Sequence, residues 1–348
     1  MWRRCLTVWT LVALASVAGC GGISTSPTLP SSPPPADPVR VSDLEKVEAA
    51  DLGDRLTVIE VPDAREPDIG NSLESLAVSE DAIWVVSHRG GIVSRIDPAT
   101  NEVVAAIESP ILPDCIPNAC VGLGDVATAG QHVWFHNQYT RSLQQVDATS
   151  NEIIGSTTVV GLAGLLGAGG LMWSGVEGGD GAVGMDPGSG EVTVTVSEGS
   201  GLYPAGFASG SVWFVGDECT ELLRVDPASG DVQGIIAIDT CIGDMVDVGN
   251  EVWAGTFQGI LRIDPATNQE LGRTRMPTEY DRVSLAVVGD SVWFRGGVTE
   301  IVRIDPVTKQ PVERIELPYG QYSAEIDSAE GSVWIANWDE GTVYRIEN

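Results

Sequence analysis

Three acidic residues occupy one position of a repeat in this 348-residue chain. Asp125, Asp244 and Glu325 each come nine residues before a tryptophan. If the repeats form a closed ring, equivalent positions converge on its axis. Converging carboxylates repel one another unless they bind a cation, hold a proton or stay solvated. The pattern predicts a site for one calcium or magnesium ion at Asp125, Asp244 and Glu325. The alternative is that each carboxylate accepts hydrogen bonds from neighbouring backbone amides.

Two histidines are predicted at the same end of the ring as these acids. His88 and His136 each end a strand that carries a repeat tryptophan. Histidine suits general acid–base catalysis near neutral pH, so both are candidate catalytic residues. The alternative for both is a role in surface loops. The third histidine, His132, falls in a turn at the opposite end and is not a candidate.

Four further residues are predicted on the same rim. Trp338 is the one tryptophan outside both the repeat and the N-terminal region, and an exposed aromatic ring can stack on a ligand. Glu74, Arg295 and Asn337 would add polar contacts beside it. These four residues are candidates for ligand binding.

The elements that must position these residues follow from the tryptophan spacing. Most intervals between successive repeat tryptophans are 39 to 41 residues, and one is 50; the tryptophans are Trp84, Trp134, Trp173, Trp213, Trp253, Trp293 and Trp334. Within each interval, short runs rich in Val and Ile alternate with turns of Gly, Pro, Asn or Asp, which indicates four strands per repeat. With 41 glycines, 20 prolines and no helical periodicity, a stack of helical repeats is excluded. The sequence predicts an all-β, seven-bladed β-propeller of four-stranded antiparallel blades, with the tryptophans as packing residues.

A recurrent turn and a missing strand complete this prediction. The segment Arg95–Asn101, with the sequence Arg-Ile-Asp-Pro-Ala-Thr-Asn, returns in close variants later in the chain and predicts an Asx-turn between the third and fourth strands. After Trp334 too few residues remain for a full blade. Arg55–Val61 resembles the outer strands, so we expect this N-terminal strand to complete blade 7 and close the ring.

The N-terminus has the features of an export signal. Arg3 and Arg4 precede an apolar stretch, Leu6–Gly19, that is too short to span a membrane comfortably. Val17-Ala18-Gly19-Cys20 resembles the lipobox of bacterial lipoproteins, which implies a lipidated Cys20. The alternative is an ordinary signal peptide with an unrelated cysteine. The predicted organisation is a signal peptide at 1–19, lipidated Cys20 with a Pro/Ser-rich tether at 20–50, and the propeller at 51–348, held outside the cytoplasm on the cell envelope.

Four cysteines lie in the predicted propeller, and an oxidising compartment favours two disulfides. Three pairings are possible. Cys115–Cys120 and Cys219–Cys241 are favoured because each pair falls in loops at one end of the ring. Zinc binding is the alternative, although no Cys-x-x-Cys pair is present.

The net charge limits the partners of the protein. At −30 the chain repels nucleic acid and offers no basic patch for lipid headgroups. We expect a monomer that contacts the membrane only through its lipid anchor. Its predicted partner is a small molecule, a glycan or an envelope protein.

The repeated Val-Trp and Arg-Ile-Asp-Pro segments, over about residues 73–348, resemble the streptogramin (virginiamycin B) lyase-like group and the related YVTN-repeat proteins. The resemblance implies a propeller. For a lyase it also implies elimination at a depsipeptide lactone, with magnesium, histidines and a glutamate in the late blades. Here those late-blade positions carry Thr256, Phe257, Arg295 and Gly296, and no histidine follows His136. Asp125, Asp244 and Glu325 resemble loosely the calcium site of lactonase-type propellers.

Two functional hypotheses follow. The first is a non-catalytic propeller that binds a ligand or protein partner on its upper face. The second is a metal-dependent lyase or hydrolase that uses the acidic residues at the central channel with His88 or His136.

Overall fold

The computed structural model describes residues 39–62, 72–88, 90–110, 122–138, 140–158, 161–176, 179–216, 218–276, 283–296, 299–317, 325–338 and 340–348. These residues form β-strands and two short 3₁₀ helices, η1 (Val41–Asp43) and η2 (Ala49–Arg55). Within these ranges no helix is long and apolar enough to cross a membrane. Cys20, Cys115 and Cys120 lie outside the described residues.

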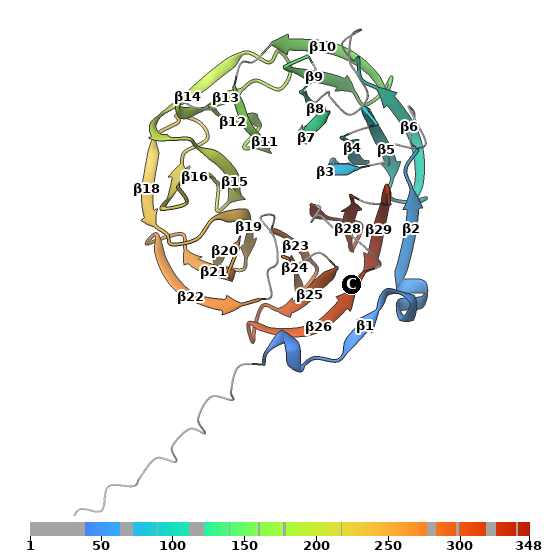
Figure 1. Ribbon diagram of the computed structural model, residues 1–348. Coiled ribbons are helices and arrows are strands. Elements are labelled where there is room, and N and C mark those ends of the chain that lie inside the picture. Colours follow the sequence, from blue (N-terminus) through green and yellow to red (C-terminus); the bar gives the residue numbers. More distant parts are fainter. Residues whose placement is uncertain are drawn as a thin grey trace, which may run out of the picture. The chain divides into compact units, whose positions relative to one another are not determined.

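The strands form antiparallel sheets arranged around a ring, with the first strand of each sheet nearest the axis (Figure 1). The first three four-stranded units follow the chain in order. Unit 1 is β3 (Leu73–Val78), β4 (Ile83–Ser87), β5 (Ile92–Asp97) and β6 (Glu102–Glu108); unit 2 is β7 (Leu123–Ala129), β8 (His132–Asn137), β9 (Ser142–Asp147) and β10 (Glu152–Thr158); unit 3 is β11 (Leu162–Ala168), β12 (Leu171–Val176), β13 (Asp180–Met185) and β14 (Val192–Ser200).

Two further units join into one eight-stranded sheet. Unit 4 is β15 (Tyr203–Ala208), β16 (Ser211–Val215), β17 (Glu221–Val225) and β18 (Val232–Ala237); unit 5 is β19 (Ile242–Val248), β20 (Glu251–Thr256), β21 (Gly259–Asp264) and β22 (Gln269–Arg275). They meet through a parallel pairing of Gly206 with Met245. The predicted disulfide Cys219–Cys241 is confirmed; it joins the loop between β16 and β17 to the connection between β18 and β19, with 4.7 Å between the Cα atoms.

The last two units each include a strand from the part of the chain that precedes unit 1. Unit 6 is β23 (Ser284–Val288), β24 (Ser291–Arg295), β25 (Glu300–Asp305) and β26 (Gln310–Glu316), with β1 (Lys46–Glu48) added parallel to β26; unit 7 is β27 (Ile326–Ala329), β28 (Ser332–Asn337) and β29 (Thr342–Glu347), with β2 (Leu56–Glu60) paired antiparallel to β29. The all-β propeller of four-stranded antiparallel blades is therefore confirmed, and we call these units blades 1 to 7.

The tryptophans of the repeat are packing residues, as predicted. Each is at most 3% exposed, between the sheets. Each indole N–H donates a hydrogen bond, for example from Trp173 to the carbonyl of Ala168 and from Trp213 to that of Ala208, both over 3.0 Å. Buried aromatic rings with satisfied N–H groups stabilise each blade against its neighbour.

The predicted Asx-turns are present, and an arginine links successive turns. Asp97 Oδ1 accepts the backbone N–H of Ala99 over 2.8 Å, and Asn101 ends the turn with φ 60°. Arg345 of blade 7 donates from Nη1 to Pro98 O and to Asn101 Oδ1, both over 2.8 Å. The repeated motif thus places the arginine of one blade within hydrogen-bond distance of the turn of the next blade.

Candidate functional site

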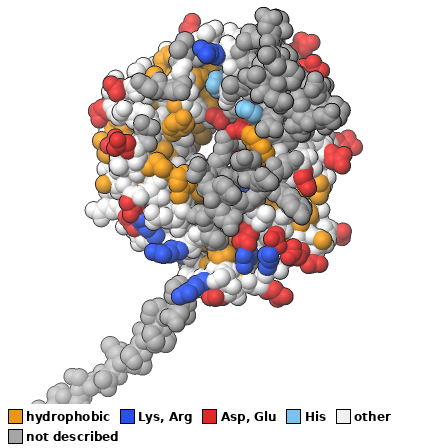
Figure 2. Space-filling view, viewed as in Figure 1, with side chains coloured by type: hydrophobic (Ala, Val, Ile, Leu, Met, Phe, Trp, Pro, Cys, Tyr) orange, Lys and Arg blue, Asp and Glu red, His pale blue; other side chains and the backbone are white. Residues whose placement is uncertain are grey.

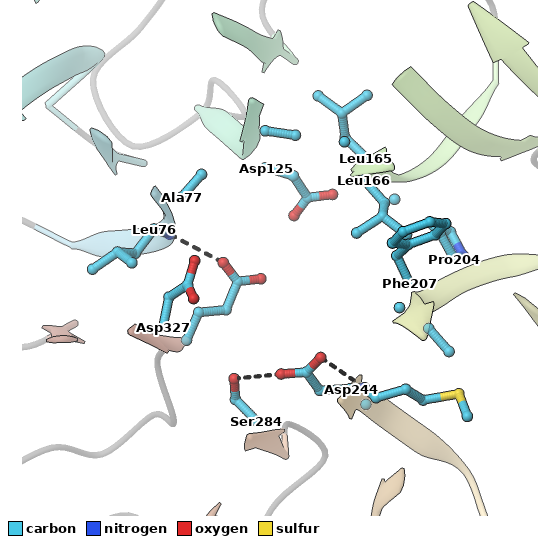
Figure 3. A pocket seen from close by; sticks show the side chains of 18 of the residues that line it. Leu76, Ala77, Asp125, Leu165, Leu166, Pro204, Phe207, Asp244, Ser284 and Asp327 are labelled. Carbon is cyan, nitrogen blue, oxygen red and sulfur yellow. Dashed lines mark hydrogen bonds between the residues drawn. The ribbon is translucent and has the colours of Figure 1, made fainter. Parts of the chain in front are cut away.

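A cavity of about 510 Å³ lies at the axis, where the innermost strand of every blade contributes to the wall. In Figure 3, the acidic side chains of Asp125, Asp244 and Asp327 are spread around this wall, and a group of apolar side chains lies between Asp125 and Asp244. Figure 2 shows acidic and hydrophobic side chains together at the centre of this face, with histidine side chains beside them. The volume lies within the range of pockets that hold small organic ligands.

The three acids of the repeat line this cavity. Asp125 on β7, Asp244 on β19 and Glu325 immediately before β27 are all part of its wall. A fourth carboxylate, Asp327, lines it too, and the sequence prediction missed it. Because side chains two apart on a strand share a face, the spacing from Glu325 could have indicated Asp327.

Two of the carboxylates bridge successive blades. Glu325 Oε2 accepts Ser75 Oγ over 2.7 Å and the backbone N–H of Leu76 over 3.0 Å. These contacts join blade 7 to blade 1. Hydrogen bonds of this kind are expected if the carboxylate accepts backbone amides and does not bind a metal ion.

Asp244 makes the same connection between blades 5 and 6. Its Oδ2 accepts Ser284 Oγ over 3.0 Å and the backbone N–H of Leu285 over 2.9 Å, while its Oδ1 accepts the N–H of Met245 over 2.7 Å. Ser284 holds the same repeat position as Ser75, nine residues before a tryptophan. In blade 3, which follows the blade of Asp125, the equivalent residue is Gly164, which has no hydroxyl group.

The described residues do not supply a metal centre at these acids. In the part of the chain that the structure covers, no three His, Cys, Asp or Glu side chains gather as a metal ion would require. Asp244 and Glu325 direct their oxygens to amides and hydroxyls of the next blade instead. The geometry fits blade-to-blade bridging better than a calcium or magnesium ion held by Asp125, Asp244 and Glu325.

Burial raises the pKa values of two of the carboxylates. Desolvation raises the pKa of Asp244 to about 7; the amides of Leu285 and Met245 oppose the shift, and the nearby charge of Asp327 adds to it. Desolvation raises the pKa of Asp327 to about 6, against the N–H groups of Ser328 and Val78. The cavity therefore changes its negative charge near neutral pH.

These pKa values predict a pH dependence of stability. A folded-state pKa above the ordinary value of 3.8 means that the folded protein keeps a proton which the unfolded chain releases. The Asp244 contribution to the free energy of unfolding should therefore decrease from about pH 4 to about pH 7 and stay constant above that. Urea unfolding at pH 5, 6, 7 and 8 should show a smaller loss of stability for Asp244→Asn than for the wild type. Asp231→Asn, at an exposed position, is the control; parallel pH profiles for wild type and Asp244→Asn would contradict the assignment.

The apolar side of the cavity was not predicted. Leu165 and Leu166 on β11, with Pro204 and Phe207 on β15, form it. Phe207 is 40% exposed and Tyr203, also in the wall, is 50% exposed. Figure 3 shows these residues across the cavity from Asp327, with Asp244 of the neighbouring strand β19 beside them.

The two histidines are not among the described residues that line the cavity. His88 Nδ1 lies 2.7 Å from Leu123 O, so Nδ1 carries the hydrogen because a carbonyl only accepts. The His88 ring also lies 5.6 Å from the Trp338 ring, at 31° between planes. His88 and Trp338 are thus brought together from blades 1 and 7, while His136 is half-buried near the end of β8.

Three of the residues predicted for the rim are buried. Glu74 is 8% exposed, and Arg295 and Asn337 are each 2% exposed. Asn337 Nδ2 donates to Tyr344 Oη over 3.0 Å, and Arg295 Nη1 donates to Ala336 O over 3.4 Å. Ligand binding by Glu74, Arg295 and Asn337 stays a prediction, and their burial leaves little side-chain surface for it.

Asn337 occupies a repeat position whose role in stabilising turns was not predicted from the sequence. Three residues after the tryptophan, blades 1, 2 and 5 carry polar residues whose side chains accept a hydrogen bond from the next turn. Ser87 Oγ accepts the N–H of Gly90, and Asn137 Oδ1 accepts that of Thr140. Hydroxyl or amide side chains recurring at this position indicate a turn-stabilising role.

No protein-family model matches this sequence, and no curated protein matches it. Solved structures share the fold at low sequence identity. Streptogramin B lyase matches at 18% identity over 84% of this chain and 97% of its own, with a TM-score of 0.64. Kuenenia stuttgartiensis hydrazine synthase matches at 14% over 83% and 99%, with a TM-score of 0.66. BamB from Moraxella catarrhalis matches at 13% over 84% and 98%, with a TM-score of 0.55. These likenesses establish the β-propeller fold.

Proposed function

We propose that this protein binds a small organic ligand in its axial cavity and does not transform it. The observation that supports this proposal is the cavity itself, about 510 Å³ with a carboxylate side and an apolar side built on rigid inner strands. A glycan or an envelope protein at the rim is less well supported, because Glu74, Arg295 and Asn337 are buried. A binding role also fits the separation of His88 and His136 from the cavity wall.

The proposed location is the outer side of a bacterial membrane, with a lipid on Cys20 as the anchor and the protein acting as a monomer. The support is the sequence Val17–Cys20 after a short apolar stretch. Palmitate labelling of cells that express the protein tests the anchor. Wild type should take up label and stay with membranes, and Cys20→Ser should lose both. Equal labelling of the two proteins would contradict the anchor.

The binding proposal is tested by screening the full-length protein against a library of small organic fragments by thermal shift and calorimetry. We expect fragments whose binding weakens at least about tenfold in Phe207→Ala, because this change removes apolar contact area from the cavity. Val104→Ala is the matched control, since Val104 is 49% exposed on the outer strand β6. Binding that is insensitive to Phe207→Ala would place the ligand elsewhere.

A metal-dependent lyase or hydrolase remains the second function, and the same assay tests it with calcium, magnesium and EDTA. We expect each to change the melting temperature by less than about 1 °C, because Asp244 and Glu325 are occupied by amides and hydroxyls of the next blade. A larger shift that Asp244→Asn and Glu325→Gln abolish would favour the metal-dependent enzyme and justify assays with lactones and esters.

A further inference from the structure

The charged side chains that line the axial cavity all carry the same sign of charge. Its wall contains four carboxylates, Asp125, Asp244, Glu325 and Asp327, and no Lys, Arg or His among the described residues that line it. The charge of Asp327 adds to the rise in the pKa of Asp244. Because nearby carboxylates oppose one another's ionisation, an entering positive charge would relieve this repulsion, and an anionic group would increase it.

The part of the wall formed by β11 and β15, next to Asp244 and across from Asp327, is suited to an organic body. Leu165, Leu166 and Pro204 offer aliphatic surface, and Phe207 and Tyr203 present partly exposed aromatic rings. Aromatic faces also attract cations. A small inorganic cation would find few oxygen ligands on this side, because most of its surface is hydrocarbon.

We infer that the ligand of the axial cavity is a hydrophobic organic cation, an ammonium group attached to an apolar or aromatic body. This inference rests on the proposed binding function and adds the chemical class of the ligand. The ammonium group lies against the side formed by Asp244 and Asp327, and the apolar body covers Leu166 and Phe207. Charge complementarity sets the orientation, and the apolar side contributes affinity.

The full-length protein is titrated calorimetrically with three probes of similar shape: benzyltrimethylammonium, the neutral neopentylbenzene and the anionic phenylmethanesulfonate. We expect the cation to bind at least about tenfold more tightly than the neutral probe and the anion more weakly than either. Asp244→Asn and Asp327→Asn should each reduce the advantage of the cation several-fold while leaving the neutral probe unchanged. Asp231→Asn, exposed and remote from the cavity wall, should change neither.

The pH profile of the wild type gives a readout that needs no variant. The titratable side chains that line the cavity with Asp244 are Asp125 on β7, Glu325 and Asp327 beside or on β27, and Tyr203 on β15. A quaternary ammonium keeps its charge at every pH. Its affinity should rise between pH 5.5 and 7.5 as Asp244 and Asp327 ionise, and that of neopentylbenzene should stay constant.

The outcomes separate the ligand class from the binding function. If the neutral or anionic probe binds as tightly as the cation, or the cation shows no pH dependence, the ligand class is wrong while cavity binding stands. If none of the three probes binds but uncharged library fragments bind in a Phe207-dependent way, the class is again wrong. If neither probes nor fragments bind in a way that Phe207→Ala weakens, the binding function itself fails.

Discussion

A chain that lacks residues 50–62 is expected to melt about 8 °C or more below the full domain, or to fail to fold. This deletion removes β2, whose residues from Leu56 to Glu60 pair with β29. Ile59 and Val61 are 5% and 6% exposed and pack in one cluster with Trp334 and Val343. Burial of each such side chain contributes about 2 kcal/mol, and the loss of strand pairing adds to this. A total on the order of 5 kcal/mol corresponds to about 8 °C in a domain of about 300 residues.

The control for this deletion is a chain that begins at Ala49. It loses β1 and η1 but keeps β2, so the inner blades remain complete. β1 pairs only with Arg314, Ile315 and Glu316, and its Lys46–Glu316 ion pair is partly exposed, so it contributes little. Val41 is buried against Trp253 and neighbours, so we expect a smaller loss, about 2 kcal/mol. Calorimetry and urea unfolding of both chains decide the point; if the deletion of 50–62 melted with the Ala49 chain, β2 would not close the ring.

The fold could be predicted from the sequence because its constraints are local and repeated. Tryptophan spacing and the Asp-Pro turn each recur within about 40 residues, so the same evidence appears many times. The convergence of Asp125, Asp244 and Glu325 followed from the same repetition. The contacts of those carboxylates could not be predicted from the repetition. Glu325, for example, binds Ser75 and Leu76, which lie 250 and 249 residues away.

The apolar side of the cavity was missed for a related reason. The glycine-rich segment Gly161–Gly181 suggests a loosened blade, but two of its glycines, Gly167 and Gly175, mark close approaches between blades. A Cβ on Gly175 would lie 1.5 Å from Leu202 O, and one on Gly167 would lie 1.7 Å from Thr128 O. Small residues here let β7, β11 and β15 approach closely, and the Leu and Phe side chains of β11 and β15 then line the axis. Composition alone does not reveal which backbones approach.

Arg345 links blade 7 to blade 1, and we expect its removal to cause the second large loss of stability. Arg345 donates to Pro98 O and Asn101 Oδ1, its Nε donates to Ser332 Oγ over 3.0 Å, and its guanidinium lies 5.3 Å from the centroid of the Trp334 ring. Arg95 makes the equivalent contacts to the turn of blade 2. Each half of this link is visible in the repeated motif, but the partner lies in the next repeat and so cannot be assigned by local reasoning.

Arg345→Ala should lower the free energy of unfolding by about 3 kcal/mol, because hydrogen bonds from a charged, partly buried group contribute about 1.5–3 kcal/mol and the contact with the indole adds about 0.5–1 kcal/mol. Arg345→Lys should recover only a small part, since an ammonium cannot reach both acceptors with the planar geometry of a guanidinium. Urea unfolding of wild type and variants measures this.

A double-mutant cycle with Asn101→Gly isolates the contact between the blades, and glycine is chosen because position 101 has φ 60°. We expect a coupling energy of about 1 kcal/mol or more. Arg273→Ala is the control, because Arg273 pairs with the exposed acids Asp239 and Glu270 and should change stability by less than about 1 kcal/mol. Equal costs for Arg345→Ala and Arg273→Ala, or no coupling with Asn101, would show that the repeated arginine does not hold successive blades together.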